Sequence, residues 1–194
     1  MNTPNKLTII RVVLIPVFMA FYLMEGMGWL LAAFVVFLAA AITDHFDGKL
    51  ARQYNQVTTF GKLMDPIADK LLIFGAFLCF MQKGQGHINA WIIMVVLLRE
   101  FLVTGVRMLA MGENNVIAAS IWGKAKTVSQ FVLVIAVMVF ELITMCFKFM
   151  PFSTDIIASV MDVLTYIMVV VSVILTIFSG WDYVWKNKGL LTFK

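Results

Sequence analysis

Charged residues are scarce in this chain. Only 13% of its 194 residues are Asp, Glu, Lys or Arg, whereas 62% are hydrophobic, and the mean hydropathy is +0.95. Soluble globular domains carry about 25% charged residues. The composition therefore excludes an ordinary soluble domain and is typical of an integral membrane protein.

Cysteine and proline are also rare, with two and four residues respectively. Cys79 and Cys146 stand alone in apolar runs without the spacing of a metal site. We therefore expect two buried thiols and no disulfide. No long linker, low-complexity tract or repeat interrupts the sequence, so we expect a single all-α domain over residues 1–194.

Long apolar runs dominate what is present. A helix needs about 20 apolar residues to cross a bilayer. About six runs approach this length, and they lie near residues 7–24, 28–44, 66–82, 88–111, 121–147 and 156–180. The fourth run contains Arg99, Glu100 and Arg107, so its charged end is expected to face a cavity or the membrane interface.

Basic residues are concentrated at one set of span ends. By the positive-inside rule, this distribution places both termini and the second and fourth connections in the cytoplasm. The net charge of +4 fits an anionic membrane surface rather than a nucleic acid, because the basic residues flank spans. We expect a multi-pass protein of a bacterial cytoplasmic membrane. The basic residues assigned to the cytoplasmic side are Lys6, Arg11, Lys49, Arg52, Lys62, Arg99, Arg107, Lys124, Lys126, Lys186, Lys188 and Lys194.

Acidic residues are concentrated in one segment. It reads Asp44-x2-Asp47-Gly48-x2-Ala51-Arg52-x8-Gly61-x3-Asp65-x3-Asp69. Unpaired carboxylates among apolar segments are heavily penalised, so these four acids predict a bound cation. They fall at one end of two adjacent predicted spans.

Helical spacing indicates how that cation is held. Asp44 and Asp47 share one helix face, as do Asp65 and Asp69 on the next helix, so the acids can surround one or two ions. An all-oxygen site suits Mg²⁺ or Mn²⁺, with Ca²⁺ also possible. Asp65 followed by Pro66 predicts a helix N-cap and first helical position.

Small and basic residues accompany the acids. Gly48 and Ala51 leave room for a flat or phosphorylated group near the helix backbone. Arg52 can pair with a phosphate or with a carboxylate. His45 lies about 100° round the helix from Asp44 and is expected to be a polar bystander rather than a ligand.

The eight spaced residues resemble, without a departure, the signature of the CDP-alcohol phosphotransferase family of integral membrane enzymes. The resemblance implies transfer of a phosphatidyl or related group from a CDP-linked donor to an alcohol, with release of CMP. It also implies a homodimer and a role for Asp69 as the base, although a carboxylate beside a dication can equally be a ligand. The residues expected to bind CDP-diacylglycerol are Asn5, Thr8, Gly48, Ala51, Arg52 and Gly61.

A second polar group indicates the acceptor. Arg99, Arg107, Lys124 and Lys126 lie at the same predicted membrane face as the aspartates, with Glu100 placed to orient a cation or the acceptor. They predict an anionic acceptor, although any one lysine can equally be a topology determinant.

Two segments are similar to the phosphatidylglycerophosphate synthase branch of the family, whose acceptor is glycerol 3-phosphate. They are the stretch of residues 2–8 with Arg11 and Pro16, and residues 99–107.

Two alternatives remain open. Sister branches that accept serine, inositol phosphate or phosphatidylglycerol share the acidic segment. A divalent-cation transporter also carries intramembrane acids, but polar residues are then expected across several spans and often in related halves. The clustering of acids at one end of two spans favours the transferase. Glu141 has no assigned role.

Overall fold

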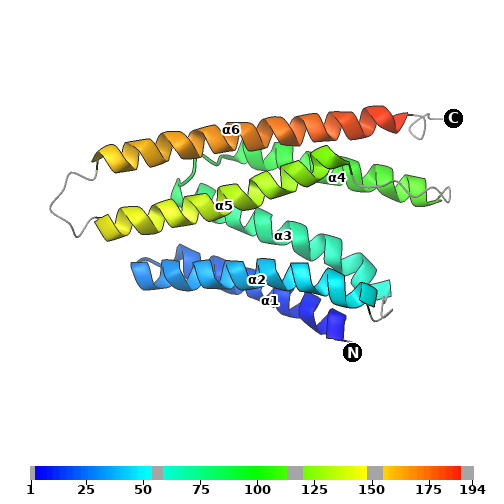
Figure 1. Ribbon diagram of the computed structural model, residues 1–194, viewed down its shortest axis with the longest axis horizontal. Helices are drawn as coiled ribbons and strands as arrows, with labels where there is room; N and C mark the ends of the chain where they lie inside the picture. Colours follow the sequence, from blue (N-terminus) through cyan, green and yellow to red (C-terminus); the bar gives the residue numbers. More distant parts are fainter. Residues whose placement is uncertain (1–2, 54–58, 113–119, 148–154, 189–194) are drawn as a thin grey trace.

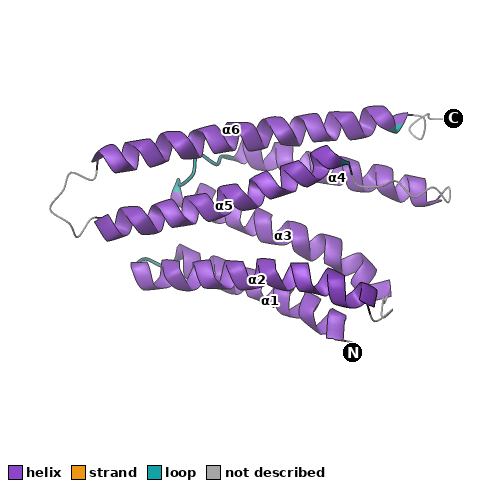
Figure 2. Ribbon diagram, viewed as in Figure 1, coloured by secondary structure: helices purple, strands orange, loops and turns teal. Residues whose placement is uncertain are grey.

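The computed structural model of the protein describes residues 3–53, 59–112, 120–147 and 155–188, and the side chains of 3–8, 44–53, 59–69, 109 and 111–112 lie outside the described part. Throughout the described residues the regular structure is helical, without a strand (Figure 2). The helices are α1 (Thr3–Leu23), α2 (Met27–Gln53), α3 (Thr59–Lys83), α4 (Ala90–Gly112), α5 (Ile121–Phe147) and α6 (Asp155–Lys186).

Successive helices run in opposite directions along one long axis (Figure 1). Helix α1 packs on α2 and α3, whereas α6 packs on α4 and α5, and α5 also contacts α2 and α3. The carboxyl ends of α2, α4 and α6 therefore face the same end of the molecule as the amino ends of α1, α3 and α5 (Figure 1). This arrangement gathers the acidic segment and the basic helix ends at one end of the bundle.

The six expected helices are present, and α5 has the expected bounds. Several other helices are longer than expected, and the largest differences are that α2 continues to Gln53, α3 already begins at Thr59 and α6 continues to Lys186. The expectation that Asp65 caps a helix is therefore wrong. One proline removes one backbone hydrogen bond without having to end a helix, and Ala, Lys, Leu and Met are good helix formers. Helical structure thus extends beyond the apolar runs.

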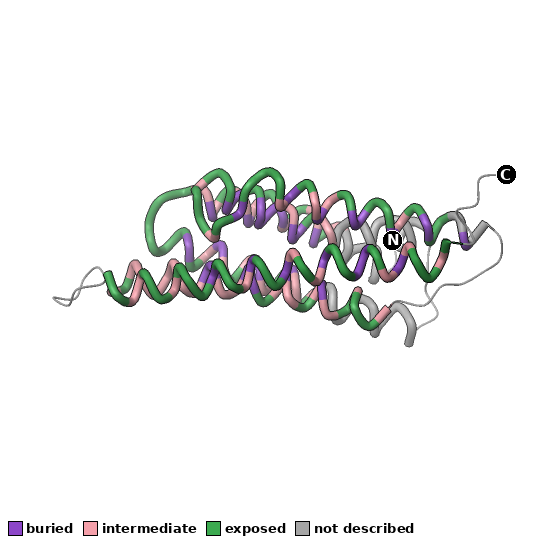
Figure 3. Tube along the Cα trace, turned by 90° about the horizontal axis from the view of Figure 1, so that it is seen from above, coloured by how far each residue is buried: buried purple, intermediate pink, exposed green. Residues whose placement is uncertain are grey.

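Two described helices, α5 and α6, are long and apolar enough to cross a membrane by length and composition alone. The described apolar parts of α1 and α2, Ile9–Leu23 and Met27–Thr43, are shorter. Buried positions recur where helices face each other and exposed positions lie outside (Figure 3). Large hydrophobic residues cover the outward side of α6, as a lipid-facing surface requires.

Five tryptophans lie within or near the terminal turns of helices and are exposed, as expected for interfacial anchors. They are Trp29, Trp91, Trp122, Trp181 and Trp185.

The two cysteines differ in burial. Both are free, as expected, and Cys79 is buried in α3. Cys146, however, is exposed, which corrects the expectation of burial. It is the penultimate residue of α5.

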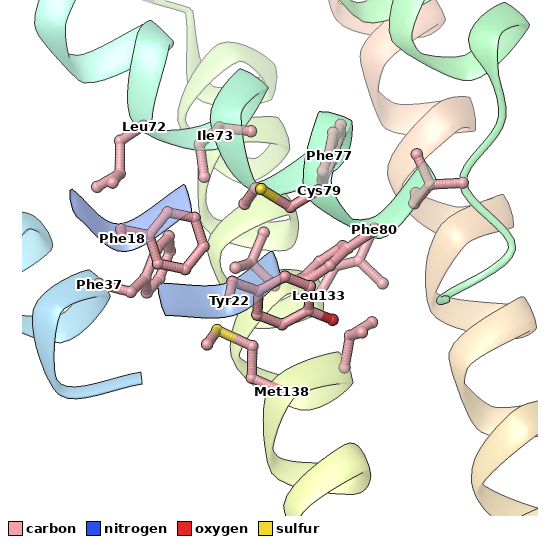
Figure 4. Close-up of a cluster of buried hydrophobic side chains, with 14 of the residues drawn as sticks. Phe18, Tyr22, Phe37, Leu72, Ile73, Phe77, Cys79, Phe80, Leu133 and Met138 are labelled. Carbon is pink, nitrogen blue, oxygen red and sulfur yellow. The ribbon is translucent and has the colours of Figure 1, made fainter. Parts of the chain in front are cut away.

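Aromatic side chains form the core between α1, α2, α3 and α5 (Figure 4). The ring centroids of Phe18 and Phe37 lie 5.5 Å apart, and those of Tyr22 and Phe80 lie 5.3 Å apart in an edge-on arrangement. Such pairs add to the stabilisation from area burial. The core therefore fixes the helices that carry the acidic segment.

A polar cluster of Tyr22, Lys83 and Glu141 lies near the end of the bundle opposite to the acidic segment, and it gives Glu141 a structural role. The Tyr22 hydroxyl donates a 2.7 Å hydrogen bond to Glu141 Oε2. Lys83 Nζ lies 3.7 Å from Glu141 Oε1 and 4.6 Å from the centroid of the Tyr22 ring. The carboxylate is thus compensated by residues of α1 and α3 at a side-chain exposure of only 10%.

We predict that Tyr22→Phe lowers the stability of the protein. The substitution keeps the ring but removes the donor to a buried carboxylate, which costs about 1–2 kcal/mol. For a chain of this size, the midpoint of thermal unfolding in detergent should fall by about 2–8 °C. Tyr166→Phe, at an exposed position on α6, is the matched control. Equal midpoints for the two variants would contradict the role assigned to Glu141.

Candidate active site

The acidic segment lies on the backbone of two helices that pack together. Asp44 and Asp47 belong to α2, and Asp65 and Asp69 belong to α3. Each pair thus has the continuous helical spacing that places its members on one face. The side chains of these acids lie outside the described residues, so their role as ligands stays a prediction. The same applies to Asn5, Thr8, Gly48, Ala51, Arg52 and Gly61.

A cavity of about 550 Å³ opens among α3, α4, α5 and α6. This volume lies within the range of small-molecule sites, about 300–1,000 Å³. The cavity contains three of the four cations expected for the acceptor, namely Arg99, Arg107 and Lys124. Its remaining lining residues are Lys70, Glu100, Val103, Thr104, Ser120, Gly123, Thr127, Val128 and Tyr183.

Glu100 is the centre of the ion pairs in this cavity. Its Oε1 accepts a hydrogen bond from Arg99 Nη1 at 3.0 Å and another from Lys126 Nζ. Its Oε2 lies 3.6 Å from Lys70 Nζ. A buried carboxylate is stable only with such compensation, and here it receives cations from three helices. Glu100 therefore contacts three cations, whereas the sequence predicted that it orients one cation or the acceptor.

Arg99 is held from α6. Ser179 Oγ accepts a 3.1 Å hydrogen bond from Arg99 Nε and another from Nη2. A Cβ added at Gly180 would lie 3.0 Å from Arg99 Cγ, and one at Gly123 would lie 3.3 Å from Nη2. The two glycines thus let α6 and α5 approach the arginine closely. The guanidinium therefore bonds both Ser179 and Glu100 while it lines the cavity.

Lys126 occupies a separate position. It is buried and lines a small cavity of about 30 Å³ beside the larger one, together with Lys70 and Glu100. Arg107 and Lys124, by contrast, are exposed at the larger cavity. Of the four residues predicted to bind the acceptor, Arg99, Arg107 and Lys124 thus line the larger cavity, and Lys126 lines the smaller one.

Lys70 was missed by the sequence argument. It follows Asp69 directly, and its Nζ donates a 2.7 Å hydrogen bond to Thr104 Oγ1 across the interface between α3 and α4. One signal was available, since a lysine beside the last acid of the motif at the start of an apolar run needs a partner. Ser179 was also missed, because nothing in the sequence distinguishes it from the other serines of α6.

The charge of the cavity region favours an anion. Five cations and one carboxylate meet there, which leaves a net charge of +4 among the residues just described. A second cavity of about 470 Å³ at the other end of α5 is instead lined by the carboxylates Glu141 and Asp162. Of these two cavities among the described residues, the one beside α3 has the charge that an anionic acceptor needs, and it adjoins the helix that carries Asp69.

Comparison with known proteins shows the family of the chain. A model of the CDP-alcohol phosphatidyltransferase family matches residues 1–181. The chain is 37% identical over 202 residues to a CDP-diacylglycerol–glycerol-3-phosphate 3-phosphatidyltransferase of Bacillus subtilis, covering 96% of this chain and 95% of that protein.

Two further relatives have similar names. A probable phosphatidylglycerophosphate synthase of Mycobacterium tuberculosis is 38% identical over 187 residues, covering 94% of this chain and 80% of the relative. A CDP-diacylglycerol–glycerol-3-phosphate 3-phosphatidyltransferase of Escherichia coli is 36% identical over 137 residues, covering 68% of this chain and 73% of the relative. With a family match that spans nearly the whole sequence, the chain belongs to the CDP-alcohol phosphatidyltransferase family.

Proposed function

We propose that the protein transfers a phosphatidyl group from CDP-diacylglycerol to glycerol 3-phosphate, which yields phosphatidylglycerophosphate and CMP. The observation that carries this proposal is the cationic cavity beside α3, whose lining residue Lys70 directly follows Asp69. An anionic acceptor bound there lies next to the acidic segment. The names of the relatives from Bacillus and Escherichia support the same donor and acceptor.

The chemistry requires one proton transfer and one displacement. The free primary hydroxyl of glycerol 3-phosphate attacks the phosphorus that carries the diacylglycerol, while Asp69 accepts the hydroxyl proton. The new phosphorus–oxygen bond replaces the bond to CMP, which leaves with its electron pair. The cations of the cavity hold the acceptor phosphate during this step.

The donor set fits a hard divalent ion, because the motif offers four carboxylates at helical spacing on two packed helices. Among the side chains that the structure describes, no other group of three or more His, Cys, Asp or Glu residues could hold a metal ion. We infer that Asp44, Asp47 and Asp65, with Asp69 beside them, hold one or two Mg²⁺ or Mn²⁺ ions. When bound, such an ion neutralises charge on the pyrophosphate.

The donor nucleotide is assigned to the helices that carry the motif. We infer that Gly48, Ala51 and Gly61 leave space for the cytidine end, and that Arg52 neutralises phosphate charge. Asn5 and Thr8 of α1 complete this proposed site, since α1 packs against both α2 and α3. The acyl chains of the donor then remain in the bilayer.

An acceptor with a phosphomonoester group fits the cavity better than the rival acceptors of the family. Serine carries no net charge and has no need of five cations. Phosphatidylglycerol has only a phosphodiester, with one negative charge. Inositol phosphate has the right charge but is bulkier, and the relatives' names favour glycerol 3-phosphate.

We further propose that all six helices span the bacterial cytoplasmic membrane, with both termini and the active site on the cytoplasmic side. The antiparallel arrangement supports this, because it places the basic helix ends together (Figure 1). A homodimer, which the family resemblance implies, belongs to the same proposal. The mass of the purified protein in detergent, corrected for bound detergent, tests the dimer.

The topology yields a labelling prediction. In a background without native thiols, made by Cys79→Ala and Cys146→Ser, His87→Cys in the α3–α4 turn should react with an impermeant maleimide added to intact spheroplasts. Lys188→Cys, beyond α6, should react only after permeabilisation. Both positions are exposed, so accessibility in the protein itself is matched. The reverse pattern would contradict the proposed orientation.

The reaction predicts a specific assay result. Purified protein with CDP-diacylglycerol and Mg²⁺ or Mn²⁺ should release CMP with glycerol 3-phosphate as the acceptor. Serine, inositol phosphate and phosphatidylglycerol should support less than about a tenth of that rate, and a chelator should abolish it. Preference for another acceptor overturns the branch but keeps the family. If folded protein releases no CMP with any acceptor, the result would favour a divalent-cation transporter instead.

The proposed base yields a kinetic prediction. Asp69→Asn keeps the size of the side chain but removes its basicity, so kcat should fall about 10²–10⁴-fold. Binding of CDP-diacylglycerol, measured by titration without acceptor, should change by less than about threefold if Asp69 is chiefly a base. Asp182→Asn is the control, since Asp182 pairs with exposed Lys186 on α6. Normal turnover of the Asp69 variant would remove Asp69 from the mechanism.

A further inference from the structure

The five cations of the cavity region differ in how far the protein already uses their hydrogen bonds. Arg99 is engaged by Ser179 and Glu100. Lys126 is buried against Glu100. These two cations mainly balance the buried carboxylate and fix the walls of the cavity. The binding of a ligand must therefore depend more on the other three.

Lys70 is the least committed member of the Glu100 cluster. Its ammonium has three hydrogen-bond donors. One donates to Thr104 Oγ1 at 2.7 Å, and the contact with Glu100 Oε2, at 3.6 Å, is longer than a hydrogen bond. The side chain is 29% exposed and lines both adjoining cavities. Lys70 therefore presents donors to the cavity from a fixed position.

The position of Lys70 in the chain links the two parts of the site. Asp69 and Lys70 are neighbours on α3, so their Cα atoms lie about 3.8 Å apart. The Lys70 side chain extends toward Thr104 of α4, on the cavity side of the helix. A three-carbon acceptor is short, so an anionic group held by Lys70 keeps the acceptor's hydroxyl close to the acidic end of α3.

We propose that Lys70 binds the phosphomonoester of the acceptor and determines the specificity of the enzyme for phosphorylated over neutral polyols. Arg107 and Lys124 face the same cavity and complete the anion site. Thr104 is a positioning residue that fixes the ammonium of Lys70. This inference rests on the proposed function and adds an acceptor-binding residue on the helix that carries Asp69.

The test compares glycerol 3-phosphate with glycerol, which lacks the phosphate, in the CMP-release assay with the full chain in detergent. In Lys70→Gln, KM for glycerol 3-phosphate should rise about 10- to 100-fold, because one charge-assisted hydrogen bond is lost. The kcat and KM for CDP-diacylglycerol should change by less than about threefold. Selectivity for glycerol 3-phosphate over glycerol should fall by the same factor as kcat/KM.

Three variants separate binding from a merely structural role. Lys70→Arg keeps the charge and should recover most of the affinity for glycerol 3-phosphate. Thr104→Val keeps Lys70 but removes the hydroxyl that accepts its hydrogen bond. This variant should raise KM for glycerol 3-phosphate about three- to tenfold. Lys186→Gln removes a lysine from the exposed pair on α6 and should leave all constants unchanged. If Lys70→Gln does not fold, Thr104→Val decides the question.

The outcomes are distinguishable from failure of the proposed function. Wild-type protein that releases no CMP with glycerol 3-phosphate overturns that function. Wild-type activity with an unchanged KM in Lys70→Gln overturns only the inference about Lys70. A fall in kcat without a rise in KM also overturns it, since the lysine would then act on the acidic segment rather than on the acceptor.

Discussion

The protein must compensate charge inside an apolar bundle, and the ion pairs of Glu100 meet this requirement for four helices. One carboxylate on α4 binds cations from α3, α4 and α5, and Arg99 extends the connection to Ser179 on α6. Removing one partner would leave another charge buried and uncompensated. The packing of α3 to α6 and the shape of the cavity therefore depend on the same electrostatic balance.

The two parts of the site are built differently. The acidic segment occupies the ends of α2 and α3, where helices extend past the apolar runs, and the aromatic core of α1, α2, α3 and α5 holds their positions (Figure 4). The basic cavity instead lies among α3 to α6. In the described part of the chain, α3 is the helix that contributes to both parts. A donor lipid and an anionic acceptor can thus occupy separate surfaces that meet along one helix.

Much of this could be predicted from the sequence, for identifiable reasons. The apolar runs predicted six helices, because hydropathy indicates the length of a span. The acidic segment indicated the family, because the spacing of its residues is specific. Hydropathy does not predict where a helix stops in polar sequence, which explains the errors at Gln53 and Asp65. The sequence indicates that Lys70 needs a partner, but the residues that Lys70 and Ser179 contact depend on how the helices pack.

The close approach of Gly180 to Arg99 has a consequence for how the enzyme can change. Because a Cβ there would lie 3.0 Å from Arg99 Cγ, any larger residue must displace either α6 or the arginine. Tyr183, one turn further along α6, lines the cavity and would move with that helix. The wall of the cavity that Tyr183 forms and the position of Arg99 thus both depend on one small residue of α6, so an evolutionary change at position 180 that alters the width of this cavity would also shift the ion pairs of Arg99.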